Sequence, residues 1–113
     1  MMNKEITISQ EEIRALIKLL LFVKFEINDE ELEIFQGSTA INSIIKKILE
    51  VDDLGEIITK RYKLISDVFL KDQIDFYKES PMFNNFSIEQ KVSYIHNMLF
   101  PYEIANEKII DLI

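Results

Sequence analysis

The chain has 113 residues and a formal net charge of −7 at pH 7. Hydrophobic residues make up 48% of it and charged residues 29%, which is ordinary for one globular domain over residues 1–113. It contains no cysteine, which excludes disulfides, thiolate metal sites and cysteine nucleophiles, and its negative charge argues against contact with a nucleic-acid backbone.

The first predicted helix covers residues 10–25. Ser9 and Glu12 have the spacing of a capping box, and apolar residues then recur at helical intervals, with Lys24 on the same face. The apolar run 19–23 is far shorter than the roughly 20 residues of a membrane span. It therefore predicts the most buried part of this helix and no membrane segment. No signal peptide is visible, so we expect a cytoplasmic protein.

The next segment, residues 26–33, is the most acidic stretch of the chain. A second capping-box pattern at 28–31 predicts a short helix that ends at Gly37. The acids form either a solvated helix face or a docking surface for a basic partner, because the aspartate spacing and central glycine of a calcium loop are missing. The acidic residues of the segment are Glu26, Asp29, Glu30, Glu31 and Glu33.

A helix over residues 39–51, capped by Ser38 or Thr39, has the clearest amphipathic pattern in the chain. Helix-turn-helix proteins are also built from several short helices. In that alternative, this helix would present Asn42, Lys46 and Lys47 to DNA, and further basic residues, Lys60, Arg61 and Lys63, follow nearby. The net charge argues against it.

Residues 53–79 predict the longest helix, about 40 Å at roughly 1.5 Å per residue. Asp53 and Glu56 form a capping box at its start, and its apolar face is interrupted at 71–73. At that point we expect either a bend or break, or a far end that leans on a partner.

The remaining chain predicts a loop and two further helices. The loop covers residues 80–85, and a capping box of Ser87 and Gln90 starts a helix that ends before Pro101. Pro101 then suits the first turn of a last helix. The chain as a whole predicts an all-α fold: a compact bundle of five to six helices around the long central helix at 53–79.

Aromatic residues and methionines gather late in the chain. They form either a satellite core that closes the loop and the last two helices, or a partly exposed patch that anchors a partner protein or a second copy of the chain. Met82 and Phe83, beside Pro81, are expected to be the most exposed. The predicted partner-binding residues are Phe76, Tyr77, Met82, Phe83 and Phe86, together with Glu26, Asp29, Glu30 and Glu33.

No motif for chemistry is present. His96 is the only histidine, and the residue three before it is Ser93, so a helical Glu-x-x-His metal site is missing. A phosphate-binding glycine loop, a serine-hydrolase elbow and a zinc motif are also missing. With 20 acidic residues, carboxylates that share a helix face are expected by chance. The sequence thus predicts no catalytic residue, no metal and no cofactor.

These observations predict a non-enzymatic protein-binding module that acts by protein–protein contact, and they leave self-association open. The identity of its partner does not follow from the sequence. A small, acidic, all-helical chain without catalytic motifs is similar in size and class to bacterial immunity proteins, phage-encoded inhibitors and small regulatory adaptors. The alternative function is a helix-turn-helix-like transcriptional regulator.

Overall fold

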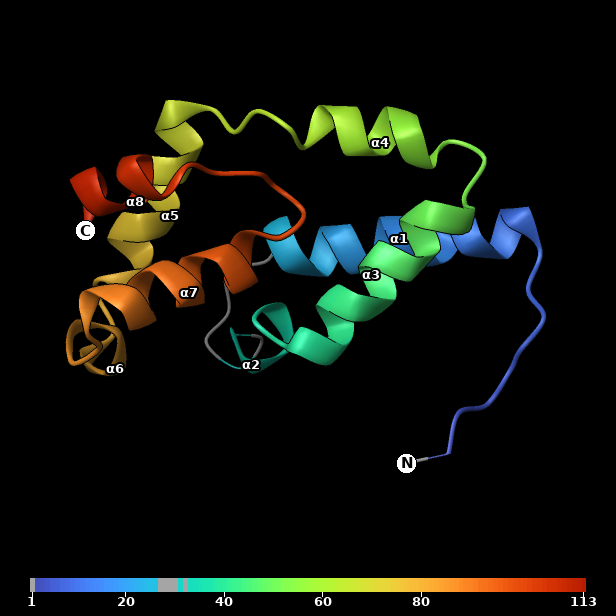
Figure 1. The fold of residues 1–113 in the computed structure, drawn as a ribbon, viewed down its shortest axis with the longest axis horizontal. Coiled ribbons are helices and arrows are strands. Elements are labelled where there is room, and N and C mark those ends of the chain that lie inside the picture. Colours follow the sequence, from blue (N-terminus) through green and yellow to red (C-terminus); the bar gives the residue numbers. More distant parts are fainter. Residues whose placement is uncertain (1, 27–30, 32) are drawn as a thin grey trace.

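The computed structural model describes residues 2–26, 31 and 33–113, and the fold is all-α, as the sequence predicts. Within these residues there are eight helices, more than the predicted five to six, and no strand (Figure 1). The helices are α1 (Gln10–Phe25), α2 (Glu33–Gln36), α3 (Thr39–Val51), α4 (Gly55–Arg61), α5 (Asp67–Tyr77), α6 (Pro81–Asn84), α7 (Ile88–Leu99) and α8 (Asn106–Leu112).

Three helices that begin with a side-chain cap, α1, α3 and α7, start where the sequence predicts. At α1, the Ser9 amide donates to the Glu12 carboxylate at 2.9 Å, and the Glu12 amide donates to Ser9 Oγ at 3.1 Å. The same reciprocal capping box starts α7, and Ser38 caps α3. These caps satisfy amide groups that have no partner inside the helix, so they fix a helix start locally.

The predicted continuous helix over 53–79 is wrong, because the chain leaves the helix after Arg61 and resumes it at Asp67. The break lies at 62–66 and not at the expected 71–73. Ser66 Oγ accepts the Phe69 amide at 3.1 Å and so caps a new helix. The Tyr62 carbonyl accepts the Glu103 amide at 3.1 Å, which holds the break against a distant segment. In Figure 1, α4 lies along the top and α5 descends on the left.

The predicted capping box of Asp53 and Glu56 is also wrong, since α4 begins after Leu54 without a side-chain cap. The start of α4 is set by its close approach to the end of α3. A Cβ atom placed on Gly55 would lie 1.9 Å from the Leu49 carbonyl oxygen. Only glycine fits this joint without a shift of the backbone.

The last helix begins at Asn106 and not at Pro101. Pro101 follows a cis peptide bond from Phe100, and the chain then runs to Ala105 in a non-helical conformation. Ile104 lies in this segment and is buried. Burial of an apolar side chain here outweighs the preference of proline for a first helical turn.

The buried apolar residues form two cores. The N-terminal core is aliphatic and lies between α1 and α3, whereas the C-terminal core contains aromatic rings and lies among α5 to α8. The N-terminal core consists of Ile13, Ile17, Leu20, Ile45 and Ile48. The C-terminal core consists of Ile65, Leu70, Ile74, Tyr77, Phe83, Ile95, Met98, Leu99, Ile104 and Ile109.

The apolar run 19–23 of α1 is only partly buried, contrary to expectation. Leu20 is buried in the N-terminal core, but Leu19 is 59% and Phe22 is 53% exposed. Neighbouring helices cover part of the α1 surface and leave an apolar face on its outer side. Within the described residues, no helix is long and apolar enough to cross a bilayer.

Candidate functional site

A groove of about 660 Å³ lies where α2, α5, α6 and α7 meet, and we call it the α2–α7 groove. It draws residues from segments far apart in the sequence. Among the described residues, its lining includes Ile34, Gly37, Phe76, Glu79, Ser80, Pro81, Met82, Phe86, Tyr94 and Asn97. Two apolar side chains of this lining are open to solvent: Ile34 of α2 is 88% exposed and Met82 of α6 is 51% exposed.

The structure divides the predicted aromatic patch in two. Phe83 and Tyr77 are buried, at 0% and 3% exposure, so they belong to the C-terminal core. The expectation that Phe83 is exposed is wrong, because Pro81 starts the helical turn α6 and Phe83 packs inward, 5.5 Å from the ring of Tyr94. Met82, on the same turn, is exposed in the groove.

Phe76 and Phe86 are half-buried and belong to the floor of the groove. Their rings also contact the core: the Phe76 ring lies 6.1 Å from that of Tyr77, and the Phe86 ring lies 5.8 Å from that of Tyr94. The groove therefore has a fixed aromatic floor. Ile34 was not among the residues predicted to bind a partner.

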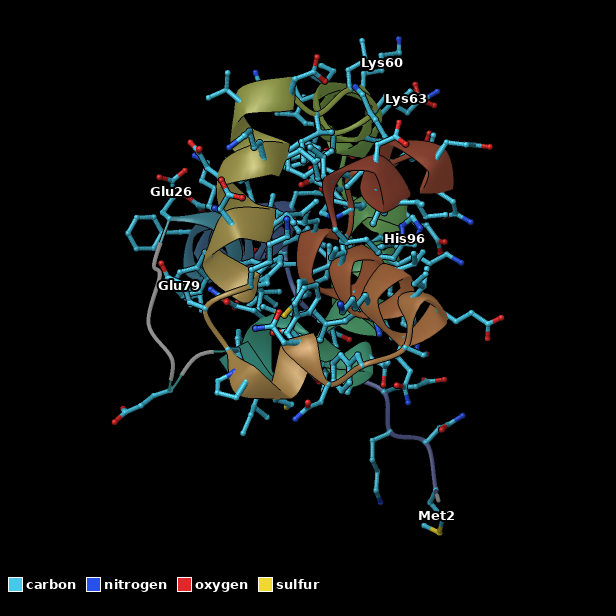
Figure 2. The ribbon with its side chains drawn as sticks, turned by 90° about the vertical axis from the view of Figure 1, so that its left-hand side faces the viewer. Met2, Glu26, Lys60, Lys63, Glu79 and His96 are labelled. Carbon is cyan, nitrogen blue, oxygen red and sulfur yellow. The ribbon has the colours of Figure 1, made fainter. Side chains whose placement is uncertain are left out.

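The predicted acidic surface is only partly visible. Glu26 is exposed, whereas Asp29, Glu30 and the side chain of Glu33 lie outside what the structure describes. Glu79 lines the groove. Figure 2 shows Glu26 and Glu79 on one side of the molecule and Lys60 and Lys63 on the other. Glu79 of the groove and Glu26 thus lie apart from these two lysines.

A buried lysine lies behind the groove. Lys24 of α1 is 5% exposed, and its ammonium donates to the Gln36 carbonyl at 2.8 Å, to Asn42 Oδ1 at 2.5 Å and to the Asn97 carbonyl at 2.8 Å. Burial lowers the pKa of Lys24 to about 7. Lys24 lies at helical spacing from Ile13 and Leu20, so it shares the buried face of α1. This spacing in the sequence already indicated that Lys24 is buried.

Of the residues named for the helix-turn-helix alternative, Lys46 and Lys47 of α3 are exposed, whereas Asn42 is not. Asn42 is buried and donates through Nδ2 to the Asn97 carbonyl at 2.9 Å, in addition to its bond from Lys24. Lys46 lines a cavity of about 970 Å³ with Lys60 and Lys63. Carboxylates alternate with these lysines, because the same lining includes Glu50, Asp52, Asp53, Glu56 and Glu103.

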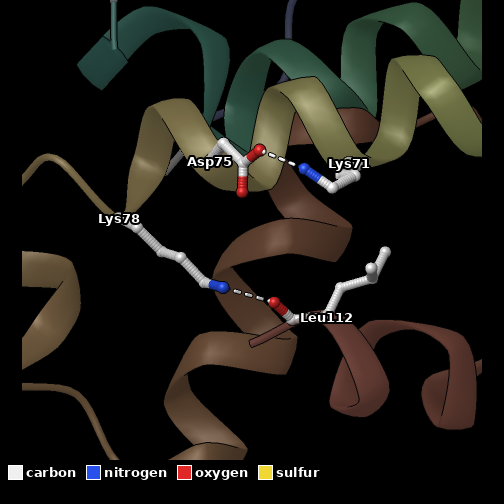
Figure 3. A network of polar contacts seen from close by, with 4 residues as sticks. All are labelled: Lys71, Asp75, Lys78 and Leu112. Atoms are coloured by element: carbon white, nitrogen blue, oxygen red, sulfur yellow. Dashed lines mark hydrogen bonds and ion pairs between the residues drawn. The ribbon is translucent and has the colours of Figure 1, made fainter.

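Two further polar contacts lie nearer the surface. His96 Nε2 lies 2.6 Å from Asn106 Oδ1. Lys71 and Asp75 form an exposed ion pair at 2.8 Å, and the hydrogen bond from Lys71 lowers the pKa of the Asp75 carboxyl (Figure 3). In the part of the chain that the structure describes, no three His, Asp or Glu side chains are grouped so that they could hold a metal ion.

Among the described residues, the lining of the α2–α7 groove is apolar and aromatic and includes the carboxylate of Glu79, which suits an apolar ligand. Comparison of the chain with protein-family models, with curated proteins and with solved structures gives no match.

Proposed function

We propose that this protein is a non-enzymatic protein-binding module, and that its α2–α7 groove takes a short apolar segment of a partner protein that also carries lysine or arginine. The observation that supports the proposal is the pair of exposed apolar side chains, Ile34 and Met82, in the lining of the groove. A partner that covers them removes apolar surface from water, which is the main favourable term in protein association.

The floor of the groove suits an anchoring side chain. Phe76, Phe86 and Tyr94 are half-buried, so each offers part of a ring surface whose position is already fixed by the core. A rigid aromatic surface loses little conformational freedom when a partner binds. Methionine in the lining adds an adaptable apolar contact, because its side chain is unbranched and polarisable.

The charge of the site supports a basic partner. Glu79 lines the groove, Glu26 lies on the same side of the molecule, and the whole chain carries a net charge of −7 (Figure 2). Complementary charge steers a basic segment towards the groove and disfavours acidic competitors. A module of this kind acts as a small regulator, inhibitor or immunity-type protein by covering a surface of its partner.

A random peptide library panned against the full chain tests this proposal. We expect the recovered peptides to combine apolar residues with lysine or arginine. They should bind the double variant Ile34→Asp, Met82→Asp at least tenfold more weakly, a loss of about 1.4 kcal/mol. Val68→Asp is the matched control, because Val68 is a 72% exposed apolar residue of α5 outside the groove.

Peptides that bind the double variant as well as the original chain would overturn the assignment of the site. Acidic or uncharged peptides whose binding Glu79→Lys does not weaken would overturn the choice of a basic partner. Light scattering gives a separate check: a dimer that the double variant disrupts would assign the groove to a second copy of the chain instead.

A further inference from the structure

The cavity of about 970 Å³ lies between the end of α3, α4 and the segment that follows α7, and we call it the α3–α4 cavity. Lys60 and Lys63 line it, and Figure 2 shows them on the side of the molecule away from Glu79 of the α2–α7 groove. The described linings of the two sites share no residue. The α3–α4 cavity is therefore independent of the function proposed above.

Asp52 is a buried carboxylate in the lining of this cavity. It directly follows α3 and is 7% exposed. Its Oδ1 atom accepts the Leu54 amide at 2.9 Å, within the tight joint between α3 and α4. Its Oδ2 atom is buried and has no hydrogen-bond donor among the described residues. A buried carboxylate oxygen without a donor costs free energy, so a donor that enters the cavity and reaches Oδ2 is stabilised there.

The lining of the α3–α4 cavity carries more negative than positive charge. Its carboxylates come from α3, the α3–α4 joint, α4 and the segment after α7, and they are Glu50, Asp52, Asp53, Glu56 and Glu103. Its cations are Lys46, Lys60 and Lys63. In the part of the chain that the structure describes, the ion pairs are Lys71 with Asp75 and Lys108 with Asp67, so none joins these two sets. Five carboxylates against three ammonium groups favour a ligand with two positive charges.

The lining also selects the kind of cation. Because Oδ1 of Asp52 is already bonded to a backbone amide, one oxygen remains, which suits an ammonium group better than a guanidinium fork that binds both carboxylate oxygens. The other carboxylates are exposed and belong to several segments, so they favour a second charge placed at a distance from the first. The half-buried rings of Phe100 and Tyr102 offer apolar surface to methylene groups between the two charges.

We propose that the α3–α4 cavity binds an aliphatic diamine or polyamine, with one ammonium group donating to Asp52 Oδ2. A second ammonium group lies among the exposed carboxylates, and the methylene chain packs on Phe100 and Tyr102. The lysines of the lining are exposed, and their long, flexible side chains can move aside as the ligand enters. The bound ligand ties the α3–α4 joint to the segment after α7, because both line the cavity.

Nuclear magnetic resonance titration of the full chain with 1,4-diaminobutane tests the site, in about 150 mM sodium chloride to screen weak surface attraction. The Leu54 amide is the reporter, because it donates to Asp52 Oδ1. We expect its signal to shift to saturation. Butylamine, which has the same carbon chain and one ammonium group, should bind roughly tenfold more weakly. A Leu54 signal that does not move would overturn the proposal, and so would equal binding of butylamine or an equal shift with magnesium chloride.

Three variants locate the ligand. Asp52→Asn keeps an oxygen for the Leu54 amide but removes the charge, and it should weaken diamine binding about tenfold. Asp111→Asn makes the same change at an exposed aspartate of α8 outside the described lining and should leave binding unchanged. Lys60→Gln removes a positive charge from the lining and should tighten binding about twofold.

Unchanged binding in Asp52→Asn, or weaker binding in Lys60→Gln, would overturn the assignment of the diamine to this cavity. If Asp52→Asn does not fold, the comparison of the three ligands on the original chain and the effect of Lys60→Gln still decide. Loss of the peptide binding described above would leave these measurements unaffected, so the two proposals fail separately.

Discussion

The two halves of the molecule are stabilised in different ways. The C-terminal half encloses a core of ten buried residues that includes Phe83 and Tyr77, and its helices cover that core on several sides. The N-terminal half has five buried aliphatic residues and leaves Leu19 and Phe22 of α1 exposed. The comparison indicates that hydrophobic burial holds the C-terminal half, while the N-terminal half depends more on close backbone joints and buried polar contacts.

The halves meet through an aromatic group as well as through Lys24. The Phe25 ring of α1 lies 5.7 Å from Tyr62 and 5.2 Å from Tyr102, and Tyr62 lies 4.6 Å from Tyr102. Phe69 of α5 lies 6.3 Å from Phe25. Because these rings come from both halves, they pack the two halves against each other. The following predictions test this comparison, from the largest effect to the smallest.

Phe83→Ala should have the largest effect, because the ring is fully buried in the C-terminal core. We expect the free energy of unfolding to fall by about 3–5 kcal/mol. Phe22→Ala is the matched change in the N-terminal half and should cost less than about 0.5 kcal/mol, as for a surface residue. Urea denaturation measures both. An equal loss in the two variants would show that the outer face of α1 is covered in solution and would break the comparison.

Gly55→Ala should damage the N-terminal half selectively. The added Cβ would lie 1.9 Å from the Leu49 carbonyl oxygen, so α4 must move away from α3. We expect a loss of about 1–3 kcal/mol, the usual cost of forcing extra atoms into a close-packed site. Amide chemical shifts should change in α3 and α4 and stay unchanged in α6. A variant as stable as the original chain would contradict the account of this joint.

Ser66→Ala tests the break between α4 and α5. It removes the oxygen that accepts the Phe69 amide, and loss of such a cap costs about 1 kcal/mol. The matched control is Ser93→Ala, an exposed serine inside α7. Thermal unfolding compares the two. If Ser93→Ala lowers the stability more than Ser66→Ala does, the Ser66 cap does not determine where α5 starts.

Lys78→Met should have the smallest effect on stability, and the effect should be confined to the end of the chain. Lys78 Nζ donates to the Leu112 carbonyl at 2.5 Å and so holds the last turn of α8 (Figure 3). We expect a loss of about 0.5 kcal/mol and faster hydrogen exchange in α8. Lys71→Met, which removes only the exposed pair with Asp75, should leave α8 unchanged. Equal exchange in both variants would show that Lys78 does not hold this end.

The sequence predicts three helix starts that local chemistry determines, and it misses a fourth, the Ser66 cap of α5. Ser9, Ser38 and Ser87 each bond an amide within the next three residues, and such a cap is visible as a short motif. It does not predict starts that distant contacts determine. The first turn of α4 depends on the position of Leu49, and the break after Arg61 is held by Glu103.

In the candidate site, too, some residues could be predicted from the local sequence and others depend on distant contacts. Met82 was predicted to be exposed because it follows a proline in a loop, and it does line the groove. Phe83 has the same neighbours in the chain, but the helical turn α6 points the Phe83 side chain into the core and the Met82 side chain towards solvent. Ile34 could not be found, because its role depends on where α2 packs relative to α7. Lys24 could have been suspected, since a charged residue on an otherwise apolar face needs buried partners.

The connection between α4 and α5 has a practical consequence. Lys63 and Leu64 are exposed, and Leu64 is 87% accessible, so the peptide bond between them is open to trypsin. A single nick there would yield fragments 1–63 and 64–113, which divide the rings around Phe25 and leave the acceptors of Lys24 on both pieces. Neither fragment can satisfy those groups alone. The nicked protein should therefore migrate as one particle, and separately produced fragments should find each other and restore the native spectrum.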